Sequence, residues 1–351
     1  RVSRAVRRSV RITSPRVDPE RYLDELLAVV EREQVSLVVP VSEETLHVSA
    51  LKQRLPAQVR LFCDVQARLM PLHDKLAFIR QARALDLPVP DSYPADSARA
   101  RVLALQADTV YKPRFGCAGR GVRRIATGGP VPDPAGPDGL VQRFLPGREV
   151  CAFAVSDRGR VLIEVQYQPR VRSGTVAVCF LRTDPDPSVS RWLRRFVAGR
   201  EHSGFIGFDF IVADDGTAQA IECNPRATSG VHFVRPEALA AAIVEGRADP
   251  DPWRPERLQQ QFFPCLNEWR GVFRDWQRWK RVGSALWQAR DVSWQWSDPL
   301  PLLTMPLTAA GIMRAAARQG VPYGEVATLD IDWRPGLAAL ASPDPLTGSG
   351  A

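Results

Sequence analysis

Two apolar segments that each carry an acidic residue constrain the fold of this chain more than any other feature. Gly207–Ile211 and Ala220–Asn224 have the apolar character of β-strands, and Asp215-Gly216 between them is a turn signal. If these two residues form a two-residue turn, Asp214 pairs with Thr217. The sequence therefore predicts an antiparallel β-hairpin whose register is set by the turn.

Oxygen-bearing side chains converge on one face of this hairpin. The register places Asp209 opposite Glu222, with Cβ atoms about 5 Å apart, and Asn224 shares the face because side chains alternate along a strand. Facing carboxylates resist burial unless a cation lies between them. Two carboxylates and an amide oxygen suit Mg²⁺ or Mn²⁺. The alternative is a solvated hairpin with unrelated acidic residues.

The front of the chain has a different pattern. Asp18 and Pro19 begin a helix that extends to about Glu33, and the continuous apolar strands Val35–Val41 and Val59–Cys63 follow, with a helix between them. This order predicts a parallel α/β layer. A doubly wound layer normally opens with a strand and its glycine-rich turn, whereas this chain begins with arginines, so either the sequence is a fragment or a neighbouring chain completes the sheet.

From residue 73 the pattern becomes antiparallel. We expect a helix over His73–Leu85, a hairpin across Asp157-Arg158-Gly159 and a helix near Ser188–His202. The other expected strands are Val110–Lys112, Val122–Ile125, Leu140–Leu145, Glu149–Ser156, Val161–Gln168, Val176–Leu181, Phe205–Ala213 and Thr217–Asn224.

A glycine-rich loop, Phe115–Gly121, lies between two of these strands. It follows Lys112 and carries Arg120, and Arg114 precedes it. Unobstructed backbone N–H groups flanked by cations form a cradle for phosphate. The alternative is an ordinary hairpin loop.

Composition limits the cellular setting and the kind of partner. The six cysteines include no CxxC pair, which excludes a zinc ribbon or disulfide scaffold and favours a cytoplasmic protein. No apolar run approaches the ~20 residues that a membrane span needs, and no export signal opens the chain. The net charge of +8 comes from arginine, since only four lysines occur, and it does not indicate nucleic-acid binding.

Taken in order, the motifs resemble the ATP-grasp superfamily, and within it the carbamoyl-phosphate-synthase-like and biotin-carboxylase-like branch of carboxylate–amine ligases. The resemblance covers about residues 15–235. It rests on His73-Asp74-Lys75, Leu87-Pro88-Val89-Pro90, Tyr111–Val122, Val141–Glu149, and the hairpin that ends in Glu222-Cys223-Asn224-Pro225-Arg226.

The resemblance implies a role for each matching residue. Lys75 and Lys112 would hold the ATP phosphates, and a loop that includes Gly116, Gly119, Arg120 and Gly121 would cover them. Gln142, Arg143, Phe144 and Leu145 would form the adenine hinge, and Glu149 would bind the ribose. The magnesium ligands would be Asp209, Glu222 and Asn224, and the catalytic residues would be Arg226 and Lys112, with Arg226 stabilising the transferring phosphoryl group.

The reaction implied is activation of a carboxylate by ATP to an acyl phosphate, which an amine then attacks. Both substrates would be small molecules, and the cofactors would be ATP with Mg²⁺ or Mn²⁺. Arg170 and Arg172 lie where the family often faces its substrate, although they also fit a solvated pair. The alternatives are carboxylation or carbamoyl-phosphate chemistry on bicarbonate, and a non-catalytic ATP-binding regulatory or membrane-associated protein.

We expect an α/β protein, α+β in its core, in three parts. Residues 1–70 would be a truncated N-terminal parallel domain, and residues 71–255 the ATP-grasp core, with a lid over about 92–140. Residues 256–351 would be a C-terminal extension rich in tryptophan and arginine. Its Trp/Arg segment would pack on the main domain, cover the active site, form a homodimer interface or lie on a membrane surface. The segment comprises Trp269, Trp276, Trp279, Trp287 and Trp294, interleaved with Arg270, Arg274, Arg278, Lys280 and Arg281.

Overall fold

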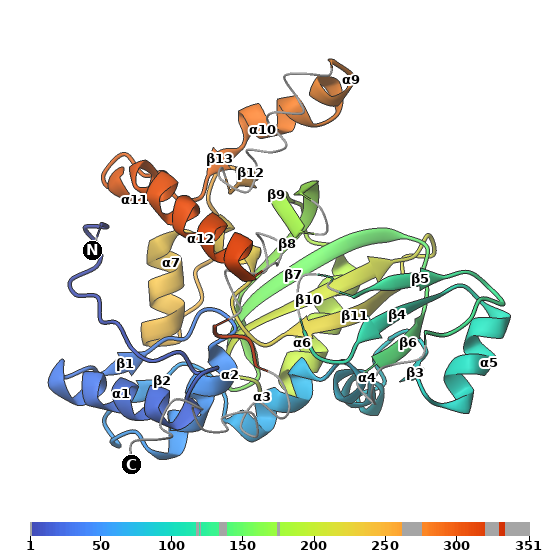
Figure 1. Ribbon diagram of the computed structural model, residues 1–351, viewed down its shortest axis with the longest axis horizontal. Coiled ribbons are helices and arrows are strands. Elements are labelled where there is room, and N and C mark those ends of the chain that lie inside the picture. The colour runs from blue at the N-terminus through green and yellow to red at the C-terminus, as the bar shows by residue number, and fades with distance from the viewer. Residues whose placement is uncertain are drawn as a thin grey trace, which may run out of the picture.

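Two β-sheets and a small parallel strand pair organise the computed structural model of the chain (Figure 1). The structure describes residues 2–116, 119, 121–132, 139–173, 176–261, 276–319 and 330–333. Its mixture of helices and strands agrees with the expected α/β class.

The N-terminal part contains the parallel strands that the sequence predicts. β1 (Leu37–Val38) pairs in parallel with β2 (Arg60–Leu61). The first helix, α1 (Pro19–Arg32), begins after Asp18, whose side chain accepts a hydrogen bond from the Arg21 N–H. A short helix, α2 (Thr45–Val48), and the 3₁₀ turn Ser49–Gln53 connect the two strands.

The larger sheet has seven strands in the order β11-β10-β7-β8-β9-β12-β13. Its neighbours are antiparallel except β12 and β13, which are parallel. The strands are β7 (Arg148–Asp157), β8 (Arg160–Ser173), β9 (Val176–Arg182), β10 (Gly204–Val212), β11 (Ala218–Asn224), β12 (Leu258–Gln260) and β13 (Arg290–Asp291). The predicted hairpin between β7 and β8 is confirmed: Arg158 and Gly159 both have positive φ, as a type I′ turn requires.

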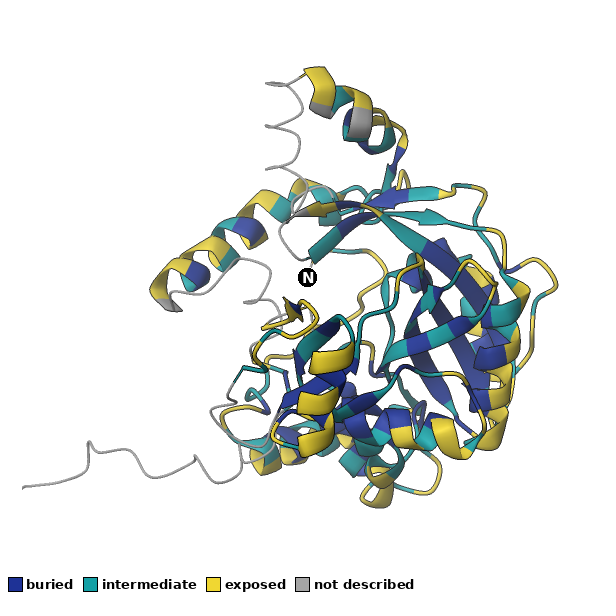
Figure 2. Ribbon diagram, turned by 90° about the vertical axis from the view of Figure 1, so that its right-hand side faces the viewer, coloured by how far each residue is buried: buried dark blue, intermediate teal, exposed yellow. Residues whose placement is uncertain are grey.

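Helices cover one face of this sheet and form the main core. These helices are α3 (Gln66–His73), α4 (Lys75–Ala84) and α6 (Pro187–Gly199). Trp192 of α6 stacks on Phe196 with ring centroids 5.2 Å apart, and it meets Phe208 and Phe210 of β10 edge-on. Figure 2 shows how these strands are buried inside the molecule.

The opposite face of the large sheet packs against a second cluster. Phe153 and Phe205 project from neighbouring strands, and their rings lie 5.8 Å apart. Phe233, from the 3₁₀ turn Ser229–Phe233, and Ala238, from α7 (Pro236–Ala240), belong to the same cluster. The π-helical turn Ala241–Glu245 extends α7. Both faces of the sheet are therefore buried near its centre.

The smaller sheet has four strands in the order β3-β6-β4-β5. They are β3 (Ser92–Pro94), β4 (Thr109–Pro113), β5 (Arg123–Ile125) and β6 (Gly139–Arg143), and α5 (Ala98–Gln106) packs on them. The sequence predicts three of these strands but not β3 or α5.

The expectation of a single helix over His73–Leu85 is wrong at its start. The structure ends α3 at His73 and begins α4 at Lys75, so Asp74 separates two helices. Its carboxylate accepts hydrogen bonds from Leu76 N at 3.0 Å and Ala77 N at 3.2 Å. Asp74 is thus an N-cap rather than a residue inside a helix.

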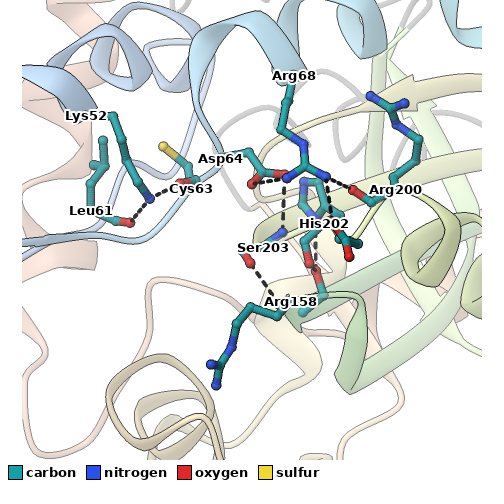
Figure 3. A network of polar contacts seen from close by, with 11 residues as sticks. Lys52, Leu61, Cys63, Asp64, Arg68, Arg158, Arg200, His202 and Ser203 are labelled. Carbon is teal, nitrogen blue, oxygen red and sulfur yellow. Dashed lines mark hydrogen bonds and ion pairs between the residues drawn. The ribbon is translucent and has the colours of Figure 1, made fainter.

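A polar network fastens the N-terminal part to the large sheet (Figure 3). Arg68 of α3 lies 4.0 Å from Asp64 and also donates to the carbonyl oxygen of Arg200. Asp64 accepts from Ser203 N at 3.3 Å, just before β10, and Ser203 Oγ accepts from Arg158 N at 2.8 Å. These bonds connect segments far apart in sequence.

The C-terminal helices α9 (Trp276–Arg278) and α10 (Ser284–Gln288), joined by the π-helical turn Trp279–Gly283, project away from the sheets in Figure 1. The expectation that the tryptophans pack on the main domain is wrong for Trp276 and Trp287, which are 68% and 74% exposed. Trp279 and Trp294 are partly buried, while Trp269, Arg270 and Arg274 lie outside the described residues, as do the side chains of Arg278 and Arg281. Lys280 lies over the ring of Trp276.

Two further helices, α11 (Leu300–Leu303) and α12 (Met305–Gln319), follow. No helix among the described residues is long and apolar enough to span a bilayer.

Candidate functional site

The hairpin of β10 and β11 pairs Asp209 with Glu222, as predicted, but its turn differs from the prediction. Ala213 pairs with Thr217, so the loop has three residues and ends at Gly216 with φ +81°. A β-bulge between the turn and the acidic pair then shifts the register by one residue. The two differences cancel, because the loop takes its extra residue, Asp214, from the β10 side, whereas the extra bulge residue, Ile221, lies in β11.

The three predicted metal ligands lie together. Asn224 Nδ2 donates to Asp209 Oδ2 at 3.4 Å. Glu222 lies across from Asp209, and its Oε1 is 3.1 Å from Lys75 Nζ. The structure therefore brings two carboxylates, one amide and one ammonium group to one point.

Burial and mutual repulsion separate the pKa values of the two carboxyl groups. Burial, reinforced by Glu222, raises the pKa of Asp209 to about 6. Burial also acts to raise the pKa of Glu222, but the ammonium groups of Lys75 and Lys112 outweigh it and hold that pKa below the usual range.

This donor set fits a divalent cation. Among the described residues no group of three or more His, Cys, Asp and Glu side chains is arranged to hold a metal ion, so Asn224 would have to act as the third ligand. The repulsion that raises the pKa of Asp209 is what a divalent cation would relieve.

The two candidate phosphate-binding lysines occupy different elements. Lys75 begins α4, and its Nζ donates to the Gly116 carbonyl oxygen at 2.8 Å. Lys112 is on β4, and its Nζ donates to Gln142 Oε1 at 2.8 Å. Burial lowers the pKa of Lys112 to about 8. Both ammonium groups interact electrostatically with Glu222, so the structure brings them to the same site.

The glycine-rich loop begins from a fixed base. Arg114 donates to both oxygens of Asp74, at 2.8 and 2.5 Å, which ties the start of the loop to the α4 cap. Gly116, Gly119 and Gly121 all have positive φ, and a Cβ on Gly121 would lie 2.9 Å from the Pro113 ring. Arg120, predicted to flank the phosphates, lies outside the described residues.

The predicted adenine hinge begins in the last two residues of β6 and continues beyond it. Gln142 is buried and donates to Ser92 Oγ at 3.1 Å. Arg143 N donates to the Asp91 carbonyl and Phe144 N to the Asp108 carbonyl, so both groups are already used. Within the described residues the Leu145 N–H makes no backbone hydrogen bond.

Glu149 and Arg172 were predicted to bind different molecules, but they contact each other. Arg172 donates to both Glu149 oxygens at 2.7 Å, across β7 and β8. Arg170 is exposed, and its charge acts on the Cys179 thiol. In this structure Arg172 is therefore paired with Glu149.

Arg226 lines a pocket between the N-terminal part and the end of β11. Its Nε is 2.8 Å from Glu43 Oε1, and one of its terminal nitrogens donates to Asn224 Oδ1 at 3.2 Å. The polar lining comprises Ser42, Glu43, Thr45, His73, Glu222 and Asn224.

Sequence reasoning missed Glu43, His73 and a C-terminal residue, Trp333. Glu43 follows the carboxyl end of the first parallel strand, where ligands of open α/β sheets gather, and that signal could have identified it. Trp333 contacts His73 and Phe115, with ring centroids 6.1 and 5.9 Å away, and nothing in the sequence indicated this contact.

The fold of the chain is similar to those of several solved structures. Three solved structures share the fold with a TM-score of 0.53 each. The biotin carboxylase domain of 2-oxoglutarate carboxylase from Hydrogenobacter thermophilus is 12% identical over 69% of this chain and 61% of its own. Campylobacter jejuni biotin carboxylase is 15% identical over 70% and 62%. Carboxyaminoimidazole ribonucleotide synthase from Aspergillus clavatus is 14% identical over 70% and 68%.

The protein thus has the fold of these ATP-dependent enzymes, although the chain spans only about six-tenths of the biotin carboxylase structures. Residues 72–230 match the family model of the ATP-grasp domain, and this part of the chain is an ATP-grasp domain. The resemblance drawn from the motifs is therefore confirmed. A search of curated protein sequences gives no match.

Proposed function

We propose that the protein is an ADP-forming ligase that activates a small carboxylate with Mg-ATP and joins it to an amine. The observation that carries this proposal is the meeting of Asp209 and Glu222 with Lys75, and of Arg226 with the adjoining pocket. Phosphoryl transfer depends on positioning and on neutralising charge, which this arrangement supplies.

ATP-grasp domains use ATP and Mg²⁺, and we assign the groups that would hold them. Asp209, Glu222 and Asn224 would hold the metal ion, which when bound neutralises phosphate charge. Lys75 and Lys112 would contact the phosphates, the glycine-rich loop would cover them, and Leu145 N–H would bind adenine. Glu149 would bind the ribose, and to do so it would have to share or release its pairing with Arg172.

The reaction has two steps. A carboxylate oxygen of the substrate attacks the γ-phosphorus of ATP, and the bond to the ADP oxygen breaks. The nitrogen of an uncharged amine then attacks the acyl carbon, inorganic phosphate leaves with the electron pair of the C–O bond, and the nitrogen loses a proton. Arg226 would neutralise the charge on the transferring phosphoryl group.

The test is ATP turnover with Mg²⁺ across amino acids, other small carboxylates and bicarbonate, with hydroxylamine as a nucleophile that traps acyl phosphates. We expect carboxylate-dependent release of ADP and phosphate and formation of a hydroxamate. Release of AMP would contradict an acyl phosphate. Turnover with bicarbonate alone would favour carboxylation instead, and bound ATP without any turnover would favour a regulatory protein.

The division of the chain at residues 70 and 255 also remains a proposal. The strand pairing of β12 and β13 with the large sheet supports moving the second boundary further along, because residues 258–260 and 290–291 extend that sheet.

A further inference from the structure

Glu43 is the acidic residue of the pocket that the proposed chemistry does not use. Its side chain is only 5% exposed, and its Oε1 pairs with Arg226. Among the described residues, no hydrogen bond to its Oε2 is observed. Because Glu43 lines the pocket, a ligand there can reach this oxygen.

The negative charge of the Glu43 carboxylate limits which ligands can bind beside it. A buried carboxylate with an open acceptor is stabilised by a cationic donor and repels phosphate. His73, on the same pocket, stays uncharged at neutral pH because burial lowers its pKa, despite the opposing effects of Glu43 and Asp332, so it does not compete for Glu43. Lys75 lies nearby, but its ammonium group is held by Glu222 and Gly116. An ammonium group on the ligand would complete the contacts of Glu43.

We place this ammonium group on the molecule whose carboxylate is activated, because the cation that such a carboxylate would contact, Arg226, lies beside Glu43. Arg226 contacts Glu43 directly, so a guanidinium and a carboxylate lie side by side. A ligand with a carboxylate and an ammonium group on one carbon matches that pair of opposite charges.

We propose, resting on the ligase function above, that the carboxylate substrate is an α-amino acid whose ammonium group binds Glu43 and whose carboxylate lies at Arg226. Glu43 thereby keeps the substrate's own amino group protonated and prevents it from acting as the nucleophile. The N-terminal part of the chain then supplies the substrate selectivity of the ATP-grasp domain.

The experiment compares each amino acid with its desamino carboxylic acid, such as alanine with propanoate, using hydroxylamine as the trap and measuring hydroxamate and ADP. We expect the best amino acid to exceed its desamino analogue about 10- to 100-fold in kcat/KM. In Glu43→Gln that ratio should fall toward one, whereas Glu43→Asp, which keeps the charge, should retain a preference for the amino acid.

Glu44→Gln is the matched control, because Glu44 Oε1 accepts from Val41 N and Ser42 N and a glutamine oxygen can do the same. Its substrate ratio should equal that of the unmodified protein. Equal use of both acids by the unmodified protein would overturn the substrate class and leave the ligase function standing. A Glu43→Gln variant that slows both acids equally would show that Glu43 only positions Arg226. Absence of ADP and hydroxamate with every acid would count against the ligase function itself.

Discussion

Glu222 is the single residue at which most of the site's charges meet. It faces Asp209 across the hairpin, lies 3.1 Å from Lys75 Nζ and is stabilised as a carboxylate by Lys112. Lys112 is a buried cation on the smaller sheet, and its ammonium group donates a hydrogen bond to Gln142. Predictions about the chemistry of single groups therefore concern these two residues.

Glu222→Gln should abolish most turnover while the fold is retained. The substitution keeps the shape of the side chain but removes the charge that a divalent cation and Lys75 require, so kcat should fall about 100-fold or more. Steady-state ADP release measures this, with circular dichroism as the check on folding. Glu245→Gln, at an exposed residue paired with Arg247, is the control. A variant with unchanged kcat would remove Glu222 from the metal site.

Lys112→Ala should weaken ATP binding about 10- to 100-fold, because a charge-assisted hydrogen bond to phosphate is lost. Calorimetric titration with ATP and Mg²⁺ gives the dissociation constant. The exposed Lys280 serves as the control, and Lys280→Ala should bind ATP normally. Equal affinity of the two variants would contradict the role given to Lys112.

At the scale of elements, the hairpin of β10 and β11 depends on one loop and one bulge. The three-residue loop places Gly216 at φ +81°, in the left-handed region. The bulge restores the pairing of Asp209 with Glu222. An added Cβ at Gly216 would meet nothing within 4 Å, so the constraint on this residue is its backbone conformation and not a steric clash.

Gly216→Ala should therefore destabilise the protein by about 1 kcal/mol through backbone strain alone. Gly311, inside α12, also has open space around it but lies in a helix, so Gly311→Ala should stabilise the protein by up to about 1 kcal/mol. Urea unfolding measures both changes. The opposite signs are the diagnostic result, and a Gly216→Ala variant as stable as the unmodified protein would exclude the left-handed loop.

At the scale of the whole molecule, the contact between the N-terminal part and the large sheet includes a polar network (Figure 3) beside its apolar core. His202, at its centre, is fully buried, and its Nδ1 lies 2.8 Å from Ser156 Oγ. Burial, together with the charges of Arg68 and Arg200, lowers the pKa of His202 to about 3. The folded protein therefore keeps this ring neutral where an unfolded chain would protonate it.

Stability should fall as the pH drops below the ordinary histidine pKa. The contribution of His202 to the free energy of unfolding is complete above about pH 6.5 and is lost progressively toward pH 3. At pH 5.5 the loss is about 1.4 kcal/mol. Urea unfolding near pH 7.5 and 5.5 measures the change. In His202→Gln the change should be smaller by about that amount, and an equal change in both proteins would contradict the assignment.

Local pattern in the sequence was enough to determine most elements and the acidic hairpin. Strand alternation correctly placed Asn224 with the acidic pair, but Asp209 and Glu222 were paired correctly only because the longer loop and the bulge offset each other. The helix break at Asp74 is also encoded locally, since aspartate is a strong N-cap. The helical pattern that precedes Asp74 hid this break in the sequence.

Only the tertiary structure decided which distant groups meet. Glu43, which precedes the ATP-grasp domain, contacts Arg226 near the end of that domain. Arg172 contacts Glu149, and Trp333 contacts Phe115. Such pairs depend on how sheets and helices pack, and packing is set by the sum of many weak contacts rather than by a short motif. The sequence by itself determined the chemistry of the nucleotide end, whereas packing decided what surrounds the pocket beside it.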